Sequence, residues 1–217
     1  MHVYALLKTP TFPLNLPKGV VSALELVVCE QLAAVVEREL GLEELQENDA
    51  TLLQAVLAHD RVIRELFGQT TVLPLRFTTF PALEELTNDL QTRQANYLET
   101  ITQLEGKAEY TIKLSPIARE TTPIPSDLKG KDYFLAKKQQ HQEQQHQQAL
   151  QSQELAQIYQ AIAQRYSTQT NPDLQQIHIL TDRSNSPQLQ QEVAILQNCF
   201  KSWEILLSEA LPPFHFV

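Results

Sequence analysis

Few side chains in this sequence have the types and spacing needed to bind a metal ion or to catalyse a reaction. His141 and His146 lie five residues apart in a predicted helix, which separates their side chains by about 140° around the helix axis. A zinc-binding pair on a helix needs the spacing i, i+4, so these two imidazoles do not share a face. We therefore predict a solvated polar helix without a bound metal; a soft, incidental metal site is the minor alternative.

His59, Asp60 and Arg61 bring three titratable groups together. Adjacent residues of a helix point in diverging directions, so surface ion pairs or a contact to Arg76 explain these groups better than catalysis does. No serine occupies a Gly-x-Ser-x-Gly elbow, and neither cysteine has a histidine neighbour in sequence. The five glycines form neither a phosphate-binding loop nor a dinucleotide fingerprint. We predict that the chain is not an enzyme and binds no cofactor.

Composition narrows the class of protein further. An apolar content of 42% with 20% charged residues is ordinary for a globular chain, and 217 residues suffice for one large or two small domains. A net charge of −9 argues against a binder of nucleic acid, which needs clustered basic residues. No apolar run approaches the roughly 20 residues that span a bilayer, and no secretory signal pattern begins the chain. These features predict a cytosolic protein without nucleic-acid or membrane partners.

The first part of the chain predicts a small α+β unit. A β-rich segment at 1–7 and a proline-rich connection to Gly19 precede a segment, 20–40, that fits either one helix or a hairpin turning at 29–31. The next helix ends at Phe67 before Gly68 and carries a broad apolar face. The residues of that face are Leu52, Leu53, Val56, Leu57, Ile63 and Leu66.

A strand at 71–77 follows. Leu73, Leu75 and Phe77 share one face of it, while Pro74 and Arg76 lie on the other. Because proline cannot donate to a ladder, this strand should lie at a sheet edge, or Pro74 at a bulge. Two interpretations stay open: a structural strand whose arginine reaches solvent or pairs locally, and an edge that recognises a partner strand.

The remainder of the chain predicts a second α+β unit. Apolar residues at spacings of three, four and seven indicate one long helix from Pro81 to Gly106, with a narrow seam that suits core packing better than a partner helix. A strand at 109–114, a long helix at 133–166, a short strand at 177–180, a helix from Ser186 and a strand at 203–207 follow. Residues 139–148 are polar on every side, so that part of the helix should project into solvent or fray.

Three segments together resemble the gas vesicle protein F/L family (GvpF/GvpL). The first is a helix with His59 followed by Val-Leu-Pro-Leu-Arg-Phe at 72–77. The second, Gly130 to Lys138 with Tyr133, is similar to the family's Gly-x-x-Tyr-Leu-x-x-Lys segment. The third, Leu-Pro-Pro-Phe-His-Phe at 211–216, is similar to its Trp-Pro-Pro-Tyr-Ser-Phe ending. Thr78 stands where the family usually has glycine, and Glu-Ala-Leu at 209–211 replaces Gly-Pro-Trp; these departures leave the resemblance intact.

The resemblance favours the hairpin over the single helix at 20–40, and the order of the predicted elements indicates two α+β domains. We expect an N-terminal α+β domain at 1–79 and a modified ferredoxin-like domain at 80–208, with a helical extension at about 126–168. The tail at 209–217 should dock across the domain junction through its aromatic residues.

The resemblance also implies a function. Members of the family are minor components of gas vesicles that act in assembly, so the expected partners are the GvpA-type shell protein and other minor vesicle proteins, and the expected location is the gas vesicle within the cytoplasm. The expected role is to bind the hydrophobic shell protein and limit its aggregation during nucleation. The alternative is a cytosolic ferredoxin-like enzyme or small-ligand binder. The candidate partner-binding or structural residues are Leu73, Pro74, Leu75, Arg76, Phe77, Tyr133, Pro212, Pro213, Phe214 and Phe216.

Overall fold

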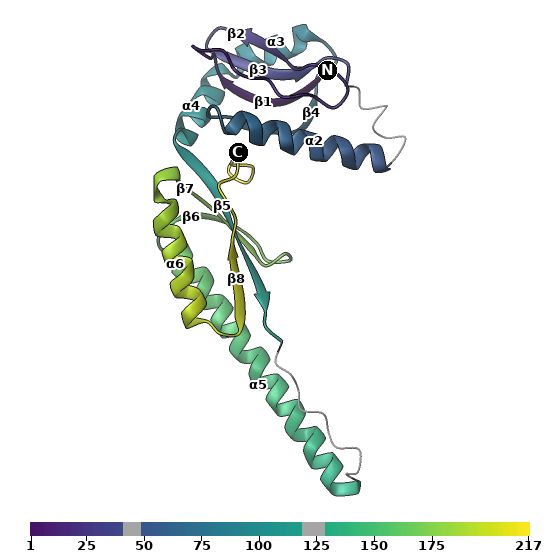
Figure 1. The fold of residues 1–217 in the computed structure, drawn as a ribbon, viewed down its shortest axis with the longest axis vertical. Helices are drawn as coiled ribbons and strands as arrows, with labels where there is room; N and C mark the ends of the chain where they lie inside the picture. Colours follow the sequence, from purple (N-terminus) through teal and green to yellow (C-terminus); the bar gives the residue numbers. More distant parts are fainter. Residues whose placement is uncertain (41–48, 119–128) are drawn as a thin grey trace. The chain divides into compact units, whose positions relative to one another are not determined.

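The computed structural model describes residues 1–40, 49–118 and 129–217, which form two compact α+β units (Figure 1). Unit 1 comprises residues 1–109 and 210–217, and unit 2 comprises residues 110–209. The predicted α+β fold class is confirmed, with one four-stranded antiparallel sheet in each unit. None of the helices described is long and apolar enough to cross a membrane.

The sheet of unit 1 has the strand order β2-β3-β1-β4. β2 and β3 form the predicted hairpin, with Glu30 and Gln31 in the turn and Glu30 at a positive φ of 52°. α2 packs against β1 and β4, α3 packs against β2, and α4 packs against β1 and β4. The bounds are β1 His2–Lys8, β2 Glu25–Cys29, β3 Leu32–Glu37, α2 Asp49–Phe67, β4 Leu73–Thr79, α3 Leu83–Thr92 and α4 Gln94–Leu104.

A buried carboxylate fixes the proline-rich connection between β1 and β2. Glu37, fully buried at the end of β3, accepts hydrogen bonds from the backbone N–H groups of Val20, Val21 and Ser22 at 2.9, 2.6 and 2.6 Å. The hydroxyl of Tyr4 donates a further hydrogen bond to the same carboxylate. Successive N–H groups that converge on one anion satisfy donors that an irregular segment cannot pair in a ladder. The Glu37 carboxylate therefore satisfies backbone donors of this connection that a regular helix would pair with its own carbonyl groups.

Gly19 is needed where this connection passes the carboxylate. A Cβ atom at position 19 would lie 2.5 Å from Glu37 Cδ and 2.5 Å from the carbonyl oxygen of Ser22. Both distances are shorter than any real contact, and the backbone oxygen cannot move aside cheaply. We expect Gly19→Ala to lower the free energy of unfolding by about 1–3 kcal/mol, the usual cost of overpacking. Chemical denaturation checks this, with Gly68→Ala as the control, because a Cβ there makes only ordinary contacts of 3.4 Å or more.

Unit 2 has the ferredoxin-like order of elements, strand-helix-strand-strand-helix-strand, with the strand order β6-β7-β5-β8. When the strands are numbered within each unit, both sheets have the order 2-3-1-4. Unit 1 has the proline-rich connection between its first two strands, where unit 2 has the helix α5. Ile158 and Ile162 of α5 and Leu189 and Val193 of α6 are buried beneath the helices. The bounds are β5 Lys107–Pro116, α5 Gly130–Ala163, β6 Ser167–Asn171, β7 Gln176–Asp182, η1 Arg183–Asn185, α6 Ser186–Cys199 and β8 Trp203–Leu207.

Two features of the fold differ from those that the sequence predicted. The strand β6 was missed, because Ser-Thr-Gln-Thr-Asn has no apolar alternation. The predicted helix 81–105 is two helices, which break at Arg93 with φ −106° and ψ 12°. Both helices lie in unit 1, whereas the predicted domain boundary assigned them to the second domain. The predicted boundary at residues 79–80, as the limit of two independently folding domains, stays a prediction. The predicted start of the helical extension, near residue 126, lies outside the described residues.

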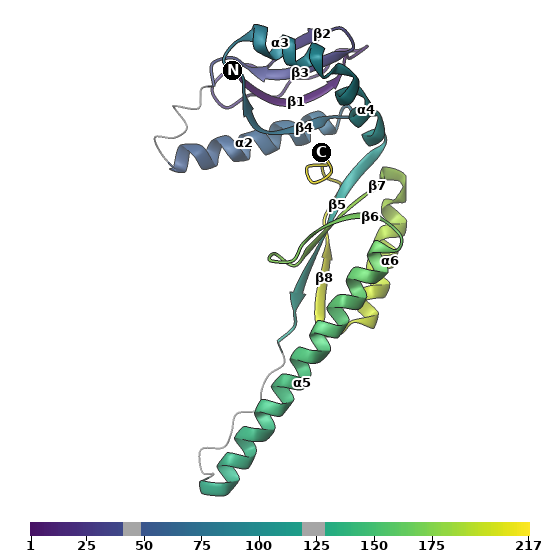
Figure 2. The same ribbon diagram turned by 180° about the vertical axis from the view of Figure 1, so that it is seen from behind.

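The N-terminal half of α5 extends well beyond the sheet of unit 2 (Figures 1 and 2). Its glutamine-rich residues are exposed or half-buried, as their polar composition predicts. Side-chain pairs one turn apart, such as Gln139 with Glu143 at 3.0 Å and Gln145 with His141 at 3.1 Å, support the helix there. Farther along, Gln151 Nε2 donates to the carbonyl of Ile117 at 3.1 Å, where the helix reaches the sheet.

Candidate functional site

β4 is an edge strand, as Pro74 predicted, and it is also interrupted by a bulge. Its ladder with β1 pairs Leu73 and Pro74 at one end and Thr78 and Thr79 at the other, and the register shifts between them. The three residues 75–77 therefore lie outside regular pairing. Bulges of this kind protect an edge from a second strand.

The bulge is fastened by two buried histidines. The carbonyl of Leu75 accepts a hydrogen bond from His59 Nε2 at 3.0 Å, and His59 Nδ1 in turn lies 2.8 Å from His2 Nε2. Because a carbonyl only accepts, His59 carries its proton on Nε2 and His2 is the donor in the second bond. Burial lowers the pKa of both imidazole rings. The pKa of His2 falls to about 3, because burial and, second, the nearby His59 both disfavour its charged form. Both imidazoles are therefore neutral structural links near pH 7.

The neighbours of His59 have separate partners. Asp60 pairs with Arg64 at 2.6 Å, and Arg61 pairs with Glu65 at 2.9 Å. All four side chains are substantially exposed, so each pair adds at most a few tenths of a kcal/mol. The three residues 59–61 thus point to different partners, as expected from their positions on a helix.

The recognition-edge hypothesis for β4 stays a prediction, and the geometry of 75–77 counts against it. The carbonyl of Leu75 is occupied by His59, and the carbonyl of Arg76 accepts from the hydroxyl of Thr78 at 2.5 Å. The side chain of Arg76 is exposed, and Phe77 packs against the rings of His2 and His59. A partner strand would meet two acceptors that are already occupied.

The C-terminal tail is held by hydrogen bonds to Glu109 near the start of β5. Glu109 and Leu211 exchange backbone hydrogen bonds of 2.9 and 2.8 Å. His215 donates to the Glu109 carboxylate from its backbone N–H at 2.9 Å and from ring Nδ1 at 2.7 Å. Pro212 and Pro213 are buried, whereas Phe214 and Phe216 are half-buried. The tail belongs to unit 1, and its predicted position across the domain junction stays a prediction.

Tyr133 lies elsewhere, on the projecting part of α5 in unit 2. It is exposed together with its neighbours Phe134 and Leu135. The predicted site residues therefore occupy separate features: the bulged edge strand and the docked tail in unit 1, and the exposed start of α5 in unit 2.

Part of the apolar face that the sequence pattern predicted on the helix before Phe67 is exposed. We define the aliphatic face of α2 as Leu52, Leu53, Val56 and Leu57, which recur one turn apart along the helix. Leu53 and Leu57 are 59% and 61% exposed, and the other two are exposed as well. Only the later residues of the predicted apolar face, Ile63 and Leu66, are fully buried. The N-terminal end of α2 extends past the sheet of unit 1 in both views (Figures 1 and 2).

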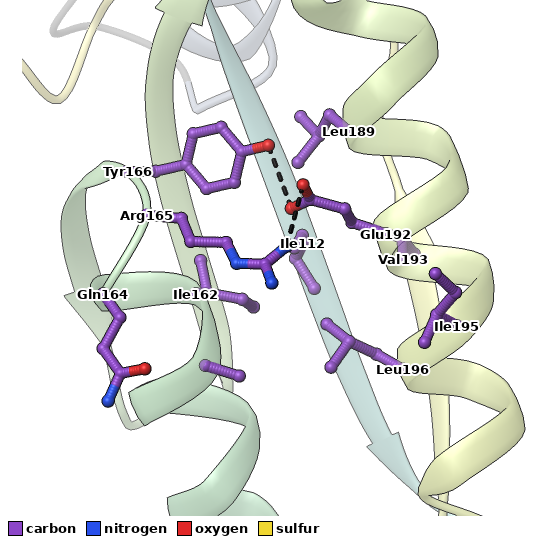
Figure 3. A pocket seen from close by; sticks show the side chains of 11 residues that line it. Ile112, Ile162, Gln164, Arg165, Tyr166, Leu189, Glu192, Val193, Ile195 and Leu196 are labelled. Atoms are coloured by element: carbon purple, nitrogen blue, oxygen red, sulfur yellow. Dashed lines mark hydrogen bonds and ion pairs between the residues drawn. The ribbon is translucent and has the colours of Figure 1, made fainter.

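Unit 2 contains a shallow groove of about 200 Å³ between the end of α5 and α6 (Figure 3). Its floor is apolar, with Ile112, Ile162 and Leu189 buried beneath it. The polar groups at its rim bind one another: Glu192 accepts from the Tyr166 hydroxyl at 3.0 Å and pairs with Arg165 at 3.0 Å. A ligand would find these groups already paired, which gives little support to a small-ligand site.

Comparison with known proteins identifies the family. The family model described as gas vesicle synthesis protein GvpL/GvpF matches residues 1–217. The chain belongs to the GvpL/GvpF family. No match was found among curated protein sequences.

Two solved structures share the fold. The crystal structure of the gas vesicle protein GvpF from Microcystis aeruginosa has a TM-score of 0.65 and 15% identity, and covers 99% of this chain and 97% of that chain. The crystal structure of GvpF from Anabaena sp. PCC7120 has a TM-score of 0.64 and 16% identity, and covers 99% and 94%. The resemblance seen in the sequence at 72–77, 130–138 and 211–216 is thus confirmed over the whole chain, and this member of the family is associated with gas vesicles.

Proposed function

We propose that this protein is a minor accessory component of gas vesicles that acts in vesicle assembly by binding the hydrophobic shell protein. It limits aggregation of that protein during nucleation and performs no covalent chemistry. The location is the gas vesicle within the cytoplasm, and other minor vesicle proteins are further partners. Family membership supports a role in gas vesicle assembly, and the aliphatic face of α2 supports binding of the shell protein.

The aliphatic face carries this proposal because it is apolar, exposed and held on a regular helix. Contiguous exposed apolar side chains on a soluble protein mark surfaces that bind other proteins or apolar ligands. A shell protein that exposes apolar surface before it joins the vesicle wall would be stabilised, and kept from aggregating, when the aliphatic face of α2 covers that surface. Each leucine buried in such a contact contributes about 1.5–3 kcal/mol before the entropic cost of association is subtracted, so several residues of the aliphatic face must be covered together.

Co-expression with the small shell protein tests this proposal. Leu53→Lys is expected to reduce the amount of shell protein that co-purifies, and the amount that stays soluble, by about tenfold or more, since burial of one leucine is lost and a charge is introduced. Gln54→Lys is the matched control, because it adds the same charge to the neighbouring exposed position of the same helix.

Leu57→Lys should reproduce the effect of Leu53→Lys. Circular dichroism of each variant establishes that the helix is intact. Equal binding by Leu53→Lys and Gln54→Lys would reject the aliphatic face as the contact, and a folded wild-type protein that binds no shell protein would reject the proposed function itself.

A further inference from the structure

The two sheets end in four edge strands, and the structure protects three of them in different ways. β4 carries Pro74 and the bulge at 75–77. β8 is covered by one side chain: Gln197 Oε1 accepts from the N–H of Ile205 at 2.7 Å, and its Nε2 donates to the carbonyl of Trp203 at 2.9 Å. That amide imitates the pairing of a neighbouring strand. β2 begins with the ion pair of Glu25 and Arg38 and is packed against by α3.

β6 has no proline, bulge, ion pair or capping side chain among the described residues, and α5 packs against it as α3 packs against β2. Its five residues, Ser167–Asn171, include no proline and no charged side chain, and they pair with β7 in unbroken register. In the part of the chain that the structure describes, no side chain forms a hydrogen bond to its outer backbone groups. An edge of this kind is a template for another strand, because its N–H and C=O groups are already aligned.

The register shows which residues present these groups. The carbonyl of Gln175, next to β7, accepts from Leu114 N–H of β5 at 2.9 Å, so odd-numbered residues on that side of β7 face β5. Even-numbered residues of β7 therefore bond to β6, and they pair with Ser167, Gln169 and Asn171. In an antiparallel ladder the alternate residues turn their N–H and C=O groups outward. Thr168 and Thr170 consequently point both groups to the open edge.

The sequence of β6 selects the partner. Ser-Thr-Gln-Thr-Asn is a chemical palindrome about Gln169: a threonine precedes and follows it, and small polar residues flank both. We infer that β6 pairs with β6 of a second copy of this chain, antiparallel about a two-fold axis at Gln169. Thr168 then exchanges both backbone hydrogen bonds with Thr170 of the second copy, and each threonine lies opposite a threonine, a favourable cross-strand pair.

The edge itself carries no charge that would oppose a second copy. Two chains that each carry a net charge of −9 repel one another over most of their surfaces, but β6 has no charged side chain. An unrelated strand would not match the palindrome.

This contact is smaller than a standard protein–protein interface, so the dimer is expected to be weak when the chain is alone in solution. Covalent trapping is a direct test, because it does not depend on a high population. Across the two-fold axis the two copies of residue 169 form a non-hydrogen-bonded pair with Cα atoms about 4.5 Å apart, a separation that a disulfide accepts. Gln169→Cys in a Cys199→Ser background should give a disulfide-linked dimer under mild oxidation.

Asp173→Cys in the same background is the control, because that exposed position does not face itself across the axis. Gln169→Cys should cross-link at least about tenfold faster than Asp173→Cys. Equal rates would overturn the proposal.

A second experiment removes one outward donor without changing the ladder to β7. Thr170→Pro deletes the N–H that faces the second copy, whereas Thr170→Val keeps it and is equally suited to a strand. Sedimentation velocity at high protein concentration should show at least about tenfold weaker self-association for Thr170→Pro than for Thr170→Val. Equal association of the two folded variants would reject the paired edge. It would also be rejected if the wild-type protein is monomeric at every concentration and the Gln169→Cys variant forms no disulfide-linked dimer.

Discussion

Glu37→Gln is expected to lower the free energy of unfolding of unit 1 by about 2–4 kcal/mol, the largest effect of any single conservative substitution considered. The carboxylate is fully buried and accepts from three consecutive backbone N–H groups and from Tyr4. Hydrogen bonds to a charged acceptor contribute about 1.5–3 kcal/mol each, and donors left unpaired by its loss pay their desolvation cost. The amide of glutamine keeps one acceptor oxygen and turns an NH₂ group toward donors.

Hydrogen-exchange mass spectrometry measures this effect, since it reports on β1 and β3 separately from unit 2. Glu39→Gln is the matched control, because it removes the same charge two residues later at an exposed position. Similar exchange in the two variants would show that the carboxylate does not hold the connection at 20–22.

The same carboxylate predicts how stability depends on pH. Burial raises the pKa of Glu37, but the hydrogen bonds from Tyr4, Val20, Ser22 and Val21 outweigh burial and lower it below its ordinary value of 4.5. A depressed pKa means that the stabilisation is present above pH 4.5 and is lost as the pH falls through the folded-state pKa. The stability difference between the wild-type protein and Glu37→Gln should therefore be constant near neutral pH and shrink below pH 4.5.

Protonation of His2 begins to destabilise unit 1 at a higher pH than protonation of Glu37 does. Its pKa is about 3 in the folded state against 6.5 for an unperturbed imidazole, chiefly because of burial. The unfolded chain binds the proton first, so unit 1 loses stability as the pH falls from about 6.5 toward 3. A wild-type protein equally stable at pH 7 and pH 5 would contradict a buried neutral His2.

Removal of the tail, residues 210–217, is expected to lower the free energy of unfolding of unit 1 by about 2–4 kcal/mol. The deletion removes the paired backbone bonds of Glu109 and Leu211 and the two hydrogen bonds that His215 donates to the Glu109 carboxylate. It also uncovers the apolar surface beneath Pro212 and Pro213, at about 25 cal/mol per Å².

His215→Ala provides a graded comparison for the deletion. It removes only the ring donor and keeps the backbone bonds, so it should cost about 1 kcal/mol. Thermal unfolding followed by circular dichroism orders the three proteins. An undiminished melting temperature for the deleted protein would show that the tail rests on unit 1 without stabilising it.

The sequence alone determined the elements with strong local signals. The proline at position 74 required an edge or a bulge, and β4 has both. For residues 20–40 the β-branched residues left a helix and a hairpin open, and the family resemblance favoured the hairpin that the structure shows. The family resemblance was carried by the segments at 72–77, 130–138 and 211–216, which are recognisable without knowledge of their contacts.

Only the tertiary structure decided how much of each element is covered and which edges are open. Periodicity identifies an apolar face on α2 but not how much of that face is covered, so it did not distinguish the exposed Leu53 and Leu57 from the buried Ile63 and Leu66. Likewise, the polar segment at 167–171 gave no strand signal, because an edge strand exposed on both faces needs no apolar alternation. Glu37 was not singled out at all, since a buried carboxylate is recognised only by donors that lie 15–17 residues away in the chain.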